Sequence, residues 1–205
     1  MSLGLHRRWK NRRAAVAAGP GPALDLAAGT GDVAQRLRRD GRLVLNGDAS
    51  LAMLAVDRRR HGRVPAVAMT AEALPLESAS VATVTLAFGL RNFTDPGRAL
   101  GEIVRVLRPG GRLCLLEFSR PAPWLRPFYR ALNAVVLPLV GGLVTARPGA
   151  YRYLAQSIDR FPDADAVSRA LEAAGLRVLA VERFACGIAA LHVAERPHED
   201  AAWTR

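Results

Sequence analysis

The sequence predicts an α/β fold in which a mostly parallel β-sheet is covered by helices on both faces. Short apolar segments, several rich in β-branched residues, alternate with amphipathic segments through most of the chain, which is typical of parallel sheets. The 205 residues, half of them apolar, suit one globular domain. We expect a single domain over residues 1–197, with a lid-like insertion at 121–155 and a flexible tail at 198–205.

Glycines and capping residues separate the elements expected in the first part of the chain. The first apolar run ends at Gly29, and the helix that follows stops near Gly41. The second strand ends close to Asp48, and Ser50 is a suitable N-cap for the next helix. In chain order we expect strand 22–27, helix 32–39, strand 43–45, helix 51–60 and strand 64–69.

The later elements are delimited in the same way. Asp95 followed by Pro96 is a helix start, because proline suits the first helical position. Residues 108–111 predict a turn, and Gly175 ends the last helix. In chain order we expect strand 81–88, a helix from 95 that carries Leu107 on its apolar face, strand 113–118, helix 163–174, and strands 176–184 and 188–195.

Composition excludes several classes of protein. Cys114 and Cys186 lie far apart and neither has a CxxC partner, so we expect no disulfide framework and no metal site. The longest uncharged apolar run, at 131–146, is too short for a membrane span and contains Pro138. The net charge of +11 suits a GC-rich coding bias or an anionic membrane surface. We expect a cytoplasmic protein and leave peripheral contact with the inner membrane face open.

A glycine bend follows the first strand. Gly29 and Gly31 allow the backbone to turn sharply and to approach a ligand closely. Asp48 ends the second strand, where its carboxylate could accept hydrogen bonds from both ribose hydroxyls. The spacing also fits a dinucleotide fingerprint, but Asp32 would repel a pyrophosphate at the start of the helix. A phosphate-free, cationic nucleoside fits this bend better.

Several longer motifs carry a resemblance to a known family. They are Phe88-Gly89-Leu90-Arg91-Asn92, Arg105-Val106-Leu107-Arg108-Pro109-Gly110-Gly111, Leu116-Glu117-Phe118-Ser119, Ser2-x-Gly4-x-His6-Arg7-x-Trp9-Lys10 and Tyr151-x-Tyr153-Leu154-x-x-Ser157. The chain closely resembles the UbiE-type quinone methyltransferases over residues 2–195. The resemblance implies a Rossmann-like class I methyltransferase fold with a seven-stranded sheet. It also implies that this chain is short at its N-terminus, because relatives begin with a further segment.

The resemblance implies S-adenosylmethionine as methyl donor, with S-adenosylhomocysteine as product, and a polyprenyl quinol as acceptor. It also implies that Thr70 stands where an acidic residue or asparagine usually contacts the adenine amino group. From the motif and the resemblance together, we expect the cofactor to contact Asp25, Ala27, Gly29, Thr30, Gly31, Asp48, Ala49, Thr70, Ala71 and Phe88. We expect the acceptor to contact His6, Trp9, Tyr151 and Tyr153.

Methylation of a ring carbon requires that a neighbouring phenol lose its proton. Arg91 and Asn92 follow the fourth strand at the ligand edge, so we expect them to be catalytic. Arg91 stays protonated and could stabilise a phenolate or orient a water, whereas Asn92 could fix a quinol oxygen. A structural ion pair for Arg91 is the alternative. His192 is a candidate base, although its apolar strand favours a structural role.

Other functions remain open at this point. A nucleic-acid methyltransferase is disfavoured, because residues 88–92 replace the Pro-Pro-aromatic motif that holds a flipped base, and we expect no nucleic-acid partner. A methyltransferase for another small phenolic acceptor is compatible with the sequence. So is a non-catalytic, cofactor-binding member of a quinone-making assembly, and so is a homodimer.

Overall fold

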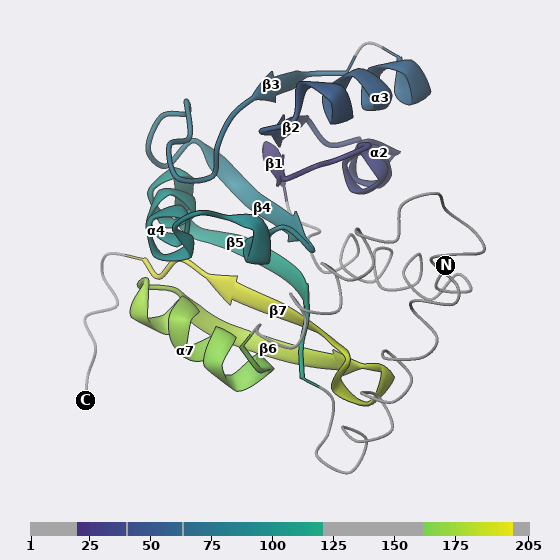
Figure 1. Ribbon diagram of the computed structural model, residues 1–205. Coiled ribbons are helices and arrows are strands. Elements are labelled where there is room, and N and C mark those ends of the chain that lie inside the picture. Colours follow the sequence, from purple (N-terminus) through teal and green to yellow (C-terminus); the bar gives the residue numbers. More distant parts are fainter. Residues whose placement is uncertain (1–19, 40, 63, 121–161, 199–205) are drawn as a thin grey trace, which may run out of the picture.

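The computed structural model describes residues 20–39, 41–62, 64–120 and 162–198. Within them, seven strands form one sheet in the order β3-β2-β1-β4-β5-β7-β6 (Figure 1). The strands are β1 (Ala23–Leu26), β2 (Val44–Asp48), β3 (Ala66–Ala68), β4 (Val81–Ala87), β5 (Leu107–Phe118), β6 (Arg177–Phe184) and β7 (Ala189–Glu195). Neighbouring strands from β3 to β5 are parallel, and β7 is antiparallel to both β5 and β6. The predicted mostly parallel, seven-stranded sheet is confirmed.

In the described ranges, four α-helices cover the two faces of this sheet (Figure 1). They are α2 (Asp32–Arg39), α3 (Leu51–His61), α4 (Pro96–Val106) and α7 (Ala164–Ala173), and two short 3₁₀ segments are η1 (Leu90–Asn92) and η3 (Ala185–Gly187). The side chain of Asn46 on β2 hydrogen-bonds Arg38 of α2 and Asp57 of α3. Both of these helices therefore lie on the same face of β2.

Two apolar clusters correspond to the two faces. One contains Leu113 and Leu115 of β5 with residues of α4 and α7, and the other contains Cys114 and Leu116 with residues of α2. Alternate residues of β5 therefore point into different layers, because successive side chains of a strand project to opposite faces. This arrangement confirms the prediction of helices on both faces, and it leaves the carboxyl ends of the strands free for a site.

The junction between α4 and β5 differs from the prediction. We expected Leu107 on the helix and a turn at 108–111 before the strand. Instead α4 ends at Val106, and the next residue, Leu107, is already the first residue of β5 and pairs with Val81 of β4. Pairing resumes at Thr83 and Arg112 after a shift of register, so residues 108–111 bulge out of a continuous strand. Gly110 accommodates this bulge with a φ of +73°.

Two expected segments lie wholly or largely outside the described residues. The lid-like insertion at 121–155 is one, and the tail at 198–205, apart from His198, is the other. Both therefore stay predictions. Among the residues that the structure describes, no helix has the length and apolar character that crossing a membrane requires.

Candidate active site

A cavity of about 380 Å³ lies at the carboxyl ends of β1, β2 and β4. The strand order reverses at β1, since the chain first adds β2 and β3 on one side and then β4 and β5 on the other. Ligands of open α/β sheets bind at such a reversal. The cavity is lined by Leu26, Ala27, Gly29, Asp48, Ala49, Met53, Met69, Thr70, Ala71, Glu72, Ala87, Phe88, Gly89, Asn92, Phe93 and Thr94.

The glycine bend after β1 forms one wall of the cavity and is tightly held. The N–H of Ala28 donates to the carbonyl of Gly47 at 3.1 Å, and the N–H of Gly31 donates to the carbonyl of Ala28 at 3.0 Å. Gly31 has a φ of +75°, and a Cβ there would overlap the carboxylate of Asp57. Asp57 is fully buried and accepts hydrogen bonds from Asn46 and His61. Glycine is therefore required at position 31 both by conformation and by space.

The carboxylate of Asp48 connects the end of β2 to the glycine bend. Oδ2 accepts a hydrogen bond from the N–H of Gly29 at 2.8 Å, and Oδ1 accepts one from the N–H of Ser50 at 2.8 Å. Each carboxylate oxygen keeps a further acceptor site, because an ionised carboxylate has about four lone-pair directions. Asp48 can thus organise the bend and still receive two hydroxyl hydrogens from a ligand.

Two residues that line the cavity have left-handed backbone conformations. Ala27 has a φ of +51° and Phe88 a φ of +57°, each directly after β1 or β4 ends. A Cβ at Gly89 would overlap that of Ala27, so the two strand ends approach closely. Such backbone outliers cluster at ligand sites, where surrounding contacts maintain them.

Most of the predicted cofactor residues line this cavity. The ones that do are Ala27, Gly29, Asp48, Ala49, Thr70, Ala71 and Phe88. Asp25, Thr30 and Gly31 do not line it. The carboxylate of Asp25 is buried and accepts hydrogen bonds from the N–H of Ala34 at 3.1 Å and the hydroxyl of Thr85 at 2.6 Å. The structure therefore places Asp25 beneath the bend, where it joins α2 to β4.

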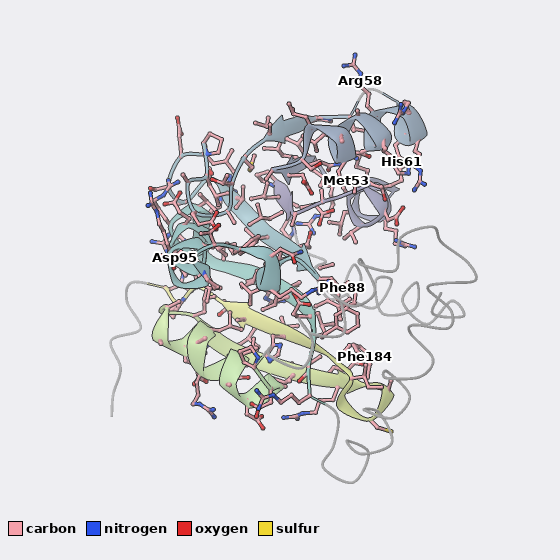
Figure 2. All side chains as sticks on the ribbon, in the orientation of Figure 1. Met53, Arg58, His61, Phe88, Asp95 and Phe184 are labelled. Carbon is pink, nitrogen blue, oxygen red and sulfur yellow. The ribbon has the colours of Figure 1, made fainter. Side chains whose placement is uncertain are left out.

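The sequence did not single out several lining residues. Met53, labelled on α3 in Figure 2, has 45% of its surface exposed beside the cavity. Glu72 accepts hydrogen bonds from the N–H groups of Thr94 at 2.8 Å and Asp95 at 3.3 Å, so it joins two loops at the rim. An apolar first turn after the Ser50 cap was the available signal for Met53. Nothing local in the sequence indicated that Glu72 would reach residues 94 and 95.

The two predicted catalytic residues lie in η1 but face different surroundings. Asn92 lines the cavity. Arg91 does not, and its Nη1 donates to Oε1 of Glu117 at 2.5 Å. Its guanidinium lies 5.0 Å from the ring centre of Phe118, which stacks on Phe88 with ring centres 4.6 Å apart. The alternative expected for Arg91, an ion pair with an acidic residue, is thus present, and this pair adjoins an aromatic residue of the cavity wall.

Glu117 is the functional candidate that sequence reasoning missed. It is the penultimate residue of β5, and only 1% of its surface is exposed. Burial raises the pKa of its carboxyl group, although the positive charge of Arg91 opposes that rise. The available signal was a carboxylate within the apolar strand at 113–118. Its partner, however, lies 26 positions earlier in the chain.

His192 of β7 has a different environment from Glu117. It is buried, and its Nε2 lies 2.9 Å from the carbonyl oxygen of Ala164 at the start of α7. Because a carbonyl can only accept, Nε2 carries the proton. Burial lowers the pKa of this imidazole, so the neutral form is favoured. The expected structural role agrees with this contact.

The remaining predicted acceptor contacts lie outside the described residues. These are His6, Trp9, Tyr151 and Tyr153. Among the described residues, Phe88 and Phe184 lie at the end of the sheet where β4 and β6 finish, and both pack against the same apolar cluster (Figure 2). Of the two, Phe88 is linked to the Arg91–Glu117 pair, because its ring contacts that of Phe118, over which the Arg91 guanidinium lies.

Comparison with known proteins identifies close relatives. The model of the ubiE/COQ5 methyltransferase family matches residues 1–196. The ubiquinone/menaquinone biosynthesis C-methyltransferase UbiE of Rubrivivax gelatinosus is 45% identical, over 96% of this chain and 79% of its own length. The demethylmenaquinone methyltransferase of Thermus thermophilus is 43% identical, over 96% of this chain and 93% of its own length. Among solved structures, a Haloferax volcanii methyltransferase in complex with the Trm112 activator has a TM-score of 0.69 at 19% identity, covering 95% of this chain and 92% of its own. That last likeness supports the class I methyltransferase fold.

Proposed function

This chain belongs to the ubiE/COQ5 methyltransferase family, and we propose that it transfers a methyl group from S-adenosylmethionine to a ring carbon of a polyprenyl quinol. It is a methyltransferase by family, and its relatives carry C-methyltransferase names from quinone biosynthesis. The charge of the cavity lining supports the choice of donor, and the residues at the end of β4 support the choice of acceptor.

One observation carries the choice of donor. In a chain with a net charge of +11, the charged residues among the described lining of the cavity are Asp48 and Glu72, and both are acidic. A pyrophosphate would be repelled by this lining, whereas a sulfonium and an ammonium group would be attracted. S-adenosylmethionine carries both of these cations and no phosphate, so it fits the cavity better than a dinucleotide does.

The lining residues suggest a role for each part of the donor. The free acceptor sites of Asp48 suit the two ribose hydroxyls, and the exposed hydroxyl of Thr70 suits the adenine amino group. Met53 and Met69 offer apolar surface for a flat ring. When bound, the donor supplies an electrophilic methyl group, and the cavity's main contribution is to position it.

We assign the acceptor side to the end of β4. Asn92 lines the cavity and can hold an oxygen of the quinol head group through its amide. Arg91 is adjacent, and its permanent charge favours the phenolate form of an acceptor hydroxyl. An ionised oxygen raises the nucleophilicity of the neighbouring ring carbon, which otherwise reacts poorly.

A direct assay tests this proposal. The purified protein would be incubated with S-adenosylmethionine and either demethylmenaquinol or the benzoquinol precursor of ubiquinone, and the quinones analysed by mass spectrometry. We expect a gain of one methyl group on a ring carbon with at least one of the two acceptors. Donor binding in calorimetry without any transfer would favour the non-catalytic alternative. Methyl transfer to other phenols but to neither quinol would favour the alternative of another small phenolic acceptor.

A further inference from the structure

Five buried polar side-chain atoms of the described residues lack a hydrogen-bond partner, and two of the five lie in one ion pair at the end of β5. Within the described part of the chain, Nε of Arg91 and Oε2 of Glu117 are both buried and unpartnered. They belong to the two members of one ion pair, whose other atoms, Nη1 and Oε1, already bond each other. Buried polar groups are normally satisfied, so an unpartnered donor and an unpartnered acceptor in one pair indicate a missing polar group.

A hydroxyl group has the chemistry to satisfy both atoms. Its oxygen can accept the N–H of Arg91, and its hydrogen can be donated to the Oε2 of Glu117. A phenol of the acceptor is such a group, and the pair adjoins the proposed acceptor side through Phe88, which lines the cavity and stacks on Phe118. The side chain of Arg91 keeps 12% of its surface exposed, so the pair is not sealed off entirely.

We infer that Glu117 accepts the proton that the hydroxyl group of the acceptor loses, and that Arg91 holds the resulting phenolate. This inference rests on the proposed function and deepens it, because the proposed function alone leaves the proton acceptor unidentified. Glu117 is thereby assigned a catalytic role, as a group in contact with the reacting hydroxyl.

The proton and electron movements balance. The acceptor's O–H bond breaks, its proton moves to Oε2 of Glu117, and its electron pair remains on the oxygen beside Arg91. The ring carbon then forms the new C–C bond as the methyl group leaves sulfur, which gives a neutral dienone. The ring hydrogen departs to solvent as a proton while Glu117 returns its proton to the oxygen. One proton is released in total, and Glu117 is regenerated.

The surroundings of Glu117 suit this task. Burial raises the pKa of its carboxyl group, and a carboxylate with a raised pKa is a stronger base. Arg91 of η1 is the ion-pair partner of Glu117, and Arg183 of β6 lies in the same row of the sheet as Glu117, with Ala190 of β7 between Arg183 and Glu117. The start of α7, which carries Asp163 and Asp165, contacts His192 of β7 through the carbonyl of Ala164. Asp165 pairs with Arg183 at 2.5 Å, and Asp163 caps α7 by accepting the N–H of Ala166. His192 lies two residues from Ala190, the strand partner of Glu117, and burial favours its neutral form. Arg91 is thus the one direct ion-pair partner of Glu117 among the described residues.

The decisive variant is Glu117→Gln, which preserves the size of the side chain and an acceptor for Arg91 but cannot take up a proton. We expect kcat to fall about a hundredfold or more, with the Kd for S-adenosylmethionine unchanged. In the unchanged protein, kcat/KM should rise with pH as Glu117 ionises, and this rise should vanish in Glu117→Gln. Glu117→Asp keeps a carboxylate, so its kcat/KM should still rise with pH, although kcat/KM should be lower than in the unchanged protein at every pH. Glu195→Gln is the matched control, because Glu195 pairs with Arg177 and Arg112 near the amino end of β5.

A second measurement does not depend on turnover. A naphthol analogue of the acceptor, added without donor, should show the absorbance of its naphtholate when bound to the unchanged protein and that of the neutral naphthol when bound to Glu117→Gln. Equal rates and equal pH profiles for the two proteins would overturn the role of Glu117. If instead the unchanged protein binds the donor but methylates neither quinol, the proposed function fails and the role of Glu117 is judged from the naphthol spectra alone. Loss of stability in Glu117→Gln with an unaltered pH profile would indicate a purely structural ion pair.

Discussion

The carboxylate of Asp48 accepts a hydrogen bond from the backbone N–H of Gly29 at 2.8 Å, so the end of β2 directly fixes the bend that follows β1. The second carboxylate oxygen is held by the N–H of Ser50, at the start of α3. The bend after β1, the end of β2 and the start of α3 therefore meet at one side chain. The same side chain is the candidate partner for the two hydroxyls of a ribose.

Replacing Asp48 by asparagine tests this double role. One carboxylate oxygen becomes an amide nitrogen, which cannot accept from a backbone N–H or from a ribose hydroxyl. We expect the Kd for S-adenosylmethionine to rise roughly 10- to 100-fold, since hydrogen bonds to charged groups contribute about 1.5–3 kcal/mol. Calorimetry measures the change. Asp163→Asn, which alters the N-cap of α7 instead, should leave the Kd unchanged. A Kd unaltered in Asp48→Asn would remove Asp48 from the donor site.

Gly31→Ala and Gly41→Ala form a matched pair. Both glycines have nearly the same left-handed φ, +75° and +76°, but a Cβ at Gly31 meets the carboxylate of Asp57 whereas a Cβ at Gly41 has no neighbour within 4 Å. Gly41→Ala should cost about 1–2 kcal/mol of unfolding free energy from the backbone conformation alone. Gly31→Ala should cost more and should also weaken donor binding. Urea unfolding of both variants gives the difference, and equal losses would contradict a steric contribution from Asp57.

The raised pKa of Glu117 predicts how stability varies with pH. Between the ordinary glutamate value of 4.5 and the raised value, the folded protein binds more protons than the unfolded chain. The contribution of this group to stability therefore decreases as pH rises through that window. Glu117→Gln should flatten this part of the profile, measured as the midpoint of thermal unfolding across a series of buffers. A profile unchanged by the substitution would contradict the raised pKa.

His192 predicts the opposite slope in another window. Burial lowers the pKa of its imidazole in the folded state below the ordinary value of 6.5. Between the lowered value and 6.5, the unfolded chain binds more protons, so stability should fall as pH falls through that range. His192→Gln retains an N–H that can donate to the carbonyl of Ala164 but does not titrate. In this variant the free energy of unfolding should no longer fall as pH falls through that range. Chemical unfolding at successive pH values measures this.

Arg91→Lys separates charge from geometry at the acceptor side. Lysine keeps the positive charge but lacks the planar guanidinium that bonds Glu117 and lies over Phe118. We expect kcat to fall roughly 10- to 100-fold with little change in the Kd for the donor. Steady-state kinetics with the preferred quinol measures both effects. Arg177→Lys, at the pair with Glu195, is the control and should be as active as the unchanged protein. A weakened donor affinity in Arg91→Lys would assign Arg91 to the donor pocket instead.

The sequence was sufficient to predict the sheet because its local features agree with one another. Ser50 and Asp95 are the N-caps where they were expected, with Pro96 in the first turn. The apolar runs became strands, of which β1, β4, β5 and β7 are largely buried. The junction at 107–112 was predicted less well. There the proline and glycines indicated a turn, but pairing of Leu107 with Val81 absorbed that turn into β5 as a bulge.

The sequence predicted the site residues that directly follow a predicted strand. It did not predict the contacts that depend on where a side chain points in the folded protein. The bend at 29–31 and Asp48 follow from strand ends that must meet at one sheet edge. Asp25 shares that neighbourhood in sequence, but its side chain points beneath the bend toward Thr85. Glu117 became a candidate only when β5 paired with β4 and brought it to Arg91. No motif in the sequence signals that the side chains of Arg91, after β4, and Glu117, in β5, form a pair.

The order of the strands has a consequence for how the protein is made. All described residues that line the cavity lie between positions 26 and 94, whereas Glu117 and its supporting strand β7 come later. During translation, all described residues of the donor pocket are therefore synthesised before Glu117, the proposed proton acceptor. Until β5 emerges, β4 is an exposed sheet edge, and such edges are prone to pair with other chains. Early binding of the donor would stabilise this unfinished half during synthesis.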